Sequence, residues 1–118
     1  MNRNLKNPRV YLEDILAAIA KIFEYTIAGK SAFFSDGKTQ DAVLYQISII
    51  GEASSKLPSS LKAKYPGIPW KKTIGMRNIV IHDYSQTDIP TVWIAVERDL
   101  PILQKTVETM LEEGTTTK

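Results

Sequence analysis

The nine residues from Met76 to Tyr84 bring together residue types that act on phosphate esters. Arg77 carries a permanent cation in a planar fork that suits phosphate oxygens. His82, the only histidine of the chain, has a side chain that titrates near neutral pH, as a general acid or base must. Beside one phosphodiester, these two groups would allow metal-free cleavage of RNA, because the 2′-hydroxyl supplies an internal nucleophile. The histidine would move the proton, and the arginine would stabilise the developing negative charge.

The spacing within this stretch limits its geometry. On an ideal helix, five positions place Arg77 and His82 about 140° apart, so their side chains would diverge. We therefore expect His82 at or beyond the end of a helix, where the chain turns toward Asp83 and Tyr84. Asn78 precedes His82 by four residues, which suits a side chain that orients the imidazole or donates to a phosphate. Its alternative role is a helix C-cap.

The count of histidines predicts a second copy of the chain at the site. Cleavage by 2′-hydroxyl attack uses a base and an acid, and one chain supplies a single histidine. Two-fold symmetry supplies another, so the enzyme hypothesis predicts a homodimer in which two copies of the stretch face each other. The sequence has no histidine–carboxylate cluster at ligand spacing, which predicts no metal and no other cofactor. Cleavage should survive a chelator and leave a cyclic 2′,3′-phosphate.

Composition sets broader limits. With 118 residues, of which 43% are hydrophobic, the chain is expected to form one domain over 1–118 with a substantial core. The net charge of +2 is too small for a general nucleic-acid coat, so RNA binding would need a local site. The absence of cysteine excludes disulfides and thiolate chemistry. No apolar run reaches membrane-spanning length, and no signal core follows the N-terminus, so we expect a cytoplasmic protein.

Apolar residues spaced by three and four predict the elements that position this stretch. A first helix is expected over about 10–28, ended by Gly29, and a second over about 39–56, ended by Leu57-Pro58. Residues 30–38 are predicted to be a loop whose aromatics, Phe33 and Phe34, lie under the domain. A helical turn over 59–65 and a third helix from Pro69 to 80 or 81 follow. The ends, 1–9 and 114–118, are expected to be flexible.

The last helix is predicted to begin near Thr87 or Asp88, either of which can cap it. Its apolar ladder is either core or dimer seam, and consists of Trp93, Val96, Leu100, Leu103, Val107 and Met110. Pro101 lies within the ladder and is expected to kink or split the helix. Trp70 and Trp93 fit a core better than a base-stacking surface. Without any strand pattern, the sequence predicts an all-α antiparallel bundle of four to five helices.

The motif resembles that of a known family. Arg77-Asn78 followed by three residues and His82 resembles the arginine–polar–x–x–x–histidine motif of the HEPN ribonucleases, and His82-x-Tyr84 resembles the HepT-like toxin branch. The resemblance covers nearly the whole chain and includes 39–43, 50–53, 69–78 and 92–93. It implies a HEPN-like helical bundle, a homodimer with a composite cleft, and metal-independent endoribonuclease activity, with Arg77 and His82 as catalytic residues.

The resemblance also implies a protein partner. Relatives in toxin–antitoxin systems of the HepT/MntA type, also called type VII-like, are silenced by a minimal nucleotidyltransferase antitoxin. That antitoxin attaches AMP to the motif tyrosine, which here is Tyr84. A bulky anionic group two residues from His82 would block the cleft and compete with RNA phosphate for Arg77.

Alternatives remain for the residues and for the whole chain. Glu52 follows Gly51 in an otherwise apolar helix, and it either reaches the cleft to bind or orient substrate or forms a salt bridge with Arg77. The chain itself could be a non-catalytic helical module that docks a minimal nucleotidyltransferase or a nucleotide. A further alternative is a dimerisation domain in which His82 is structural.

Overall fold

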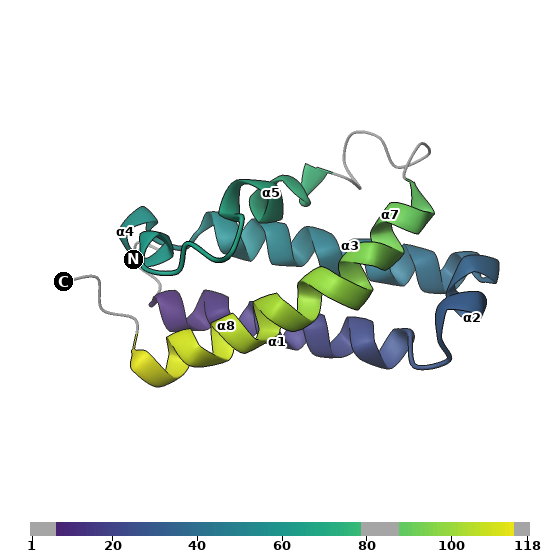
Figure 1. The fold of residues 1–118 in the computed structure, drawn as a ribbon, viewed down its shortest axis with the longest axis horizontal. Helices are drawn as coiled ribbons and strands as arrows, with labels where there is room; N and C mark the ends of the chain where they lie inside the picture. Colours follow the sequence, from purple (N-terminus) through teal and green to yellow (C-terminus); the bar gives the residue numbers. More distant parts are fainter. Residues whose placement is uncertain (1–6, 79–87, 115–118) are drawn as a thin grey trace, which may run out of the picture.

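The computed structural model describes residues 7–78 and 88–114, which form helices and contain no strand. In Figure 1 two long rods run side by side and a third crosses them obliquely, with the shorter helices at their ends and along one side. The rods are α1 (Pro8–Tyr25), α3 (Gly37–Ser55) and a continuous helix made of α7 (Ile89–Ile94), η3 (Ala95–Asp99) and α8 (Leu100–Glu113). The short helices are α2 (Lys30–Ser35), α4 (Ser59–Ala63) and α5 (Trp70–Gly75). The predicted all-α bundle is confirmed.

Polar caps fix where the two long N-terminal helices begin. Asn7 accepts a hydrogen bond from the Arg9 N–H at 2.9 Å, and Pro8 occupies the first turn, so α1 starts two residues before the predicted Val10. Asp36 caps α3 in the same way, accepting from the Lys38 N–H at 3.1 Å. These caps satisfy N–H groups that the helices leave without partners.

The core lies where the three rods meet. The apolar ladder of the last helix is buried from Trp93, which is 8% exposed, to Val107 and Met110, which are fully buried. It faces buried side chains of α1 and α3, among them Leu12, Ile15, Ile19, Ile22, Val43, Ile47 and Ile50. Of the two alternatives for the ladder, the structure therefore selects core over dimer seam.

The loop predicted over 30–38 is wrong, because α2 occupies Lys30–Ser35. Tertiary contacts stabilise this helix, which at six residues is too short to be stable on its own. Phe33 is 1% exposed and its ring centroid lies 5.3 Å from that of Trp93, while the Gln40 side chain donates to the Phe33 carbonyl at 2.9 Å. Only Phe33 lies under the domain as expected, since Phe34 is 41% exposed.

Two further helix boundaries were predicted, at Pro101 and at the end of the third helix. Pro101 was expected to kink or split the last helix; the helix is continuous, but its regular α-helical pattern is interrupted by the π-helical turn η3 directly before α8, which has Pro101 in its first turn. The wider π-helical turn lets the helix continue through Pro101 although proline has no N–H to donate. The helix α5 ends at Gly75, where the Met76 and Arg77 N–H groups donate to carbonyls three residues earlier and tighten the last turn. Asn78 is again helical, and the predicted end of the third helix at 80 or 81 lies outside the described residues.

Candidate active site

Arg77 lies on the turn that follows α5, against Gly51 and Glu52 in the C-terminal part of α3. Its guanidinium Nη1 lies 3.4 Å from Glu52 Oε1, and the two side chains are 40% and 56% exposed. Solvent screens such a pair, which contributes about 0–1 kcal/mol to stability. The Arg77 cation is therefore held in one place by a weak bond and stays accessible to a ligand.

Glu52 contacts two cations at once. Its second carboxylate oxygen, Oε2, lies 3.6 Å from the Lys56 ammonium one turn further along α3. Two cations share one carboxylate, so the group of three side chains carries one net positive charge. The salt bridge considered for Glu52 is present, and it places this carboxylate directly beside the candidate catalytic arginine.

The short helix α5 positions Arg77 because its inner face is anchored in the core. Ile68 and Thr73 are buried at 5% and 6% exposure, and the Thr73 hydroxyl donates to the Pro69 carbonyl at 3.2 Å. The Trp70 indole N–H donates to the Tyr65 carbonyl at 3.1 Å, and its ring packs against the core. Trp70, like Trp93, is thus a packing residue, as predicted.

The structure brings together two of the predicted site residues, Arg77 and Glu52. Asn78 is exposed and directly follows Arg77. His82, Asp83 and Tyr84 lie outside the described residues, so the predicted approach of imidazole and guanidinium stays a prediction.

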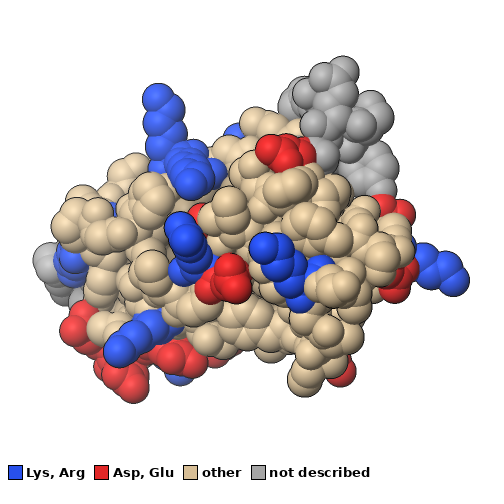
Figure 2. Space-filling model, turned by 45° about the vertical axis from the view of Figure 1, so that its right-hand side comes forward, with Lys and Arg blue, Asp and Glu red and all other residues tan. Residues whose placement is uncertain are grey.

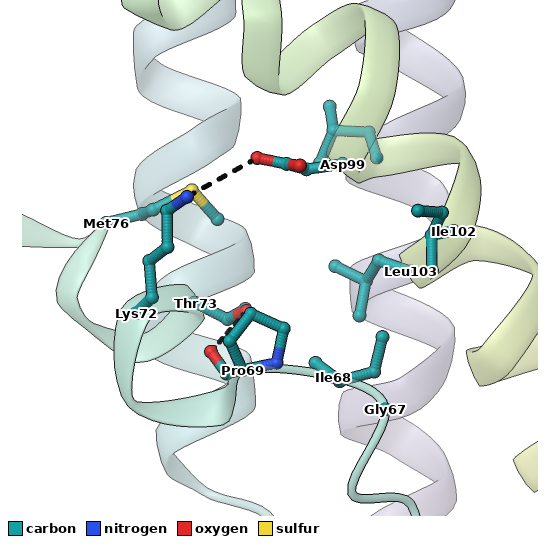
Figure 3. Close-up of a pocket in the computed structure, with 10 residues that line it drawn as sticks. Gly67, Ile68, Pro69, Lys72, Thr73, Met76, Asp99, Ile102 and Leu103 are labelled. Carbon is teal, nitrogen blue, oxygen red and sulfur yellow. Dashed lines mark hydrogen bonds and ion pairs between the residues drawn. The ribbon is translucent and has the colours of Figure 1, made fainter.

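A hollow surface beside Arg77 was not predicted from the sequence. A cavity of about 300 Å³ is lined by Gly75 and Met76 of the α5 end and by Thr91, Ile94 and Ala95 on the facing helix, among others. A second cavity of about 90 Å³ lies further along α8 (Figure 3), where Ile102 and Leu103 face α5. We call the two cavities together the α5–α8 groove.

One ion pair spans the α5–α8 groove. In Figure 3, Lys72 reaches from α5 to Asp99 on the opposite helix, with their charged atoms 3.8 Å apart. The apolar rim is partly open to solvent, since Ile94 is 48% and Ile102 is 58% exposed. The only sequence signal for this surface was that Ile94 and Ile102 fall off the buried ladder of the last helix.

Charge is distributed without a broad basic surface on the face shown in Figure 2. There, Lys and Arg side chains alternate with Asp, Glu and uncharged residues over the part of the chain that the structure describes. A nucleic acid would gain little from general attraction to such a face. Binding of a nucleic acid to this face would depend on local cations. Within the same described ranges, no helix is long and apolar enough to cross a bilayer.

Fold and site together define the class of protein: an α-helical bundle that presents an arginine, held by a carboxylate, at the end of a short helix. Residues 15–110 match the ribonuclease HepT-like family. The chain therefore belongs to the HepT-like ribonuclease family, as the resemblance of its motifs implied.

Individual relatives agree with this assignment. The chain is 43% identical over 96 residues to the "Probable ribonuclease HepT" of Thermococcus cleftensis, covering 80% of this chain and 86% of that protein. It is 39% identical over 109 residues to a Methanocaldococcus jannaschii protein named as a γ-glutamylcyclotransferase and candidate RNase. That match covers 92% of this chain but 49% of the relative, so the chain spans about half the length of that protein. No solved structure matches the chain significantly.

Proposed function

We propose that this protein is a metal-independent endoribonuclease toxin that cleaves RNA by attack of the 2′-hydroxyl on the adjacent phosphate. Arg77 stabilises the charge that develops on the phosphate, and His82 moves the proton. Asn78 orients the imidazole or the phosphate, and Glu52 orients Arg77. The observation that carries the proposal is the accessible Arg77 guanidinium, fixed by Glu52 at 3.4 Å in a member of the HepT-like ribonuclease family.

The chemistry is tested with purified protein and a labelled single-stranded RNA. His82→Ala and Arg77→Ala should each abolish cleavage while circular dichroism and thermal unfolding stay close to those of the unchanged protein. The products should end in a cyclic 2′,3′-phosphate and form in the presence of a chelator. Cleavage by His82→Ala at the original rate would overturn the proposal.

The active form is proposed to be a homodimer with a composite cleft. The α5–α8 groove supports this, because it is apolar, opens beside Met76 and therefore borders the Arg77 turn. A second copy bound there across a two-fold axis would bring two Arg77 side chains toward one another. Ile94→Lys should then give a monomer by light scattering and lose activity. Ile27→Lys is the matched control, since Ile27 is 87% exposed on the turn after α1, and it should leave the dimer intact.

The proposed cellular partner is a minimal nucleotidyltransferase antitoxin that attaches AMP to Tyr84. Added AMP would place a phosphate near the site and compete with RNA for Arg77. Mass spectrometry after co-expression with such an enzyme should find the adduct on the tryptic peptide that contains Tyr84, and Tyr84→Phe should not be modified. An adduct on another residue, or none, would contradict this part of the proposal.

The alternative function is a non-catalytic module that docks a minimal nucleotidyltransferase or a nucleotide. The same accessible Arg77 would serve it, as a binding group for phosphate. Under this alternative the protein leaves RNA uncut, and Arg77→Ala weakens nucleotide binding in calorimetry.

A further inference from the structure

Gly51 lies against the backbone of Arg77. A Cβ atom built on Gly51 would come within 2.5 Å of the Arg77 amide nitrogen, 2.9 Å of its Cβ and 3.0 Å of its Cα. Heavy atoms do not approach a Cβ so closely, and the atoms in the way are two backbone atoms and the Cβ fixed to them, which cannot swing aside as the end of a long side chain can. Position 51 therefore excludes every residue larger than glycine while the Arg77 turn stays where it is.

The requirement for glycine applies to position 51 and not to the positions of the other glycines. Gly51 lies within α3, where glycine weakens a helix relative to alanine. Its backbone conformation does not explain its presence either, since positive φ angles occur at Gly29 and Gly114 instead. At the chain's other five glycines, an added Cβ would meet nothing within 4 Å among the described residues. The closest approach is thus found at the proposed catalytic arginine.

Glu52, the residue after Gly51, fixes the other end of Arg77. Glu52 holds the Arg77 guanidinium at 3.4 Å, so adjacent positions on α3 fix the two ends of the same arginine. Gly51 sets how closely its backbone approaches α3, and Glu52 sets where its charged end lies. A shift of the turn by a Cβ would move the guanidinium relative to this carboxylate and to any bound phosphate.

We infer that Gly51 is a positioning residue for RNA cleavage, which sets the depth of the Arg77 turn on α3 and thereby places the guanidinium against the scissile phosphate. The inference rests on the proposed function. The role of Gly51 is indirect, since glycine has no side chain with which to touch the substrate.

The primary variant is Gly51→Ala, and the matched control is Gly37→Ala, on the same helix at a position with open space. Displacement of a reacting group by about 1 Å can cost on the order of 100-fold in rate. We expect Gly51→Ala to lower kcat/KM for RNA by about 10- to 100-fold, mostly through kcat, and Gly37→Ala to change it less than twofold. Equal activities of the two variants would overturn the inference.

A double-variant comparison separates positioning from general damage to the fold. Arg77→Lys keeps a cation but loses the planar fork, so residual cleavage can be measured. If Gly51 acts through Arg77, adding Gly51→Ala to Arg77→Lys should cost much less than adding it to the unchanged protein. An equal loss in both backgrounds would show that Gly51 acts elsewhere, and would overturn the inference.

Nuclear magnetic resonance (NMR) spectra provide a structural readout that does not depend on activity. The Nε–H signal of Arg77, identified as the one missing from Arg77→Lys, should shift in Gly51→Ala and stay in place in Gly37→Ala. If Gly51→Ala does not fold, Glu52→Ala provides the second test. Its Arg77 backbone amide should keep its signal position and hydrogen-exchange protection, because the glycine contact remains. Loss of both in Glu52→Ala would overturn the inference. If the protein cleaves no RNA, the proposed function fails, but these spectra still test whether Gly51 positions Arg77.

Discussion

The helix α3 (Gly37–Ser55) contacts two of its neighbours, α1 and the end of α5, in opposite ways. Against α1 it presents apolar side chains that are fully buried, such as Val43 and Ile50, facing the likewise buried Ile19. Against the end of α5 it presents a glycine with no side chain and a half-exposed carboxylate. The first contact removes a large apolar area from water and stabilises the fold. The second contributes little stability and holds a cation at the surface, so changes in the two regions should affect different properties.

Truncation at the α1–α3 contact should give the largest effect. Ile19→Ala removes a fully buried side chain and leaves a cavity, which typically costs about 2–5 kcal/mol. Urea unfolding should measure this loss, while the fraction that remains folded cleaves RNA at the original rate. A loss of specific activity at full folding would contradict the separation between the two regions.

At the other contact, Arg77→Ala should remove activity and spare stability. Loss of one group that stabilises a developing anion costs about 100- to 1,000-fold in rate. The exposed pair with Glu52 contributes about 0–1 kcal/mol, so the unfolding midpoint should barely change. Lys56→Ala is the matched control, since it removes a cation bound to the same carboxylate. A similar loss of activity in both variants would indicate general attraction of RNA instead of a specific role for Arg77.

Glu52→Gln should have a smaller effect. It separates two roles of Glu52, which are to orient the Arg77 guanidinium and to add a negative charge beside it. The change removes a negative charge beside Arg77, so RNA should bind about two- to threefold more tightly at low salt, and the gain should vanish at high salt. Turnover should fall, because the guanidinium is no longer held. Binding by fluorescence anisotropy and single-turnover rates measure the two parts. Unchanged affinity together with unchanged turnover would show that Glu52 does not act on Arg77.

The smallest expected effect lies far from both contacts, at the N-cap of α3. The Thr39 hydroxyl donates to Asp36 at 2.8 Å, and this bond lowers the pKa of Asp36 below its usual 3.8. A lowered pKa stabilises the fold above the usual value, and that stability is lost as pH falls through the lowered one. Asp36→Asn keeps a capping oxygen but does not titrate, so its thermal midpoint should fall less between pH 4 and pH 2. Identical acid profiles would exclude this contribution.

The sequence predicted those features that depend on local patterns. The ladder from Trp93 to Met110 and a cap at Thr87 or Asp88 follow from spacing and residue type; the structure shows the ladder buried and the cap at Asp88. The helix α2 was missed because it depends on Phe33 packing against Trp93, a contact between residues sixty positions apart. The π-helical turn before Pro101 was missed because its sequence does not distinguish it from a kink.

The residue types of the site could be predicted from the sequence, whereas the contacts that position them could not. Arg77 and its possible pairing with Glu52 could be named because opposite charges are visible in a sequence. The contact between Gly51 and the Arg77 backbone could not be, since it requires the crossing of α3 and the α5 end. The α5–α8 groove likewise exists only once Ile94 and Ile102 are placed off the buried ladder.

The carboxylate of Glu52 also acts as a resident competitor for any anion that approaches Arg77. An incoming group must displace a negative charge already 3.4 Å away, which a singly charged ion does poorly. A chain of phosphates can meet this requirement, because its neighbouring charges interact with other cations while one phosphate exchanges with the carboxylate. The arrangement would therefore discriminate between free inorganic anions and a polyanionic strand before any bond is broken.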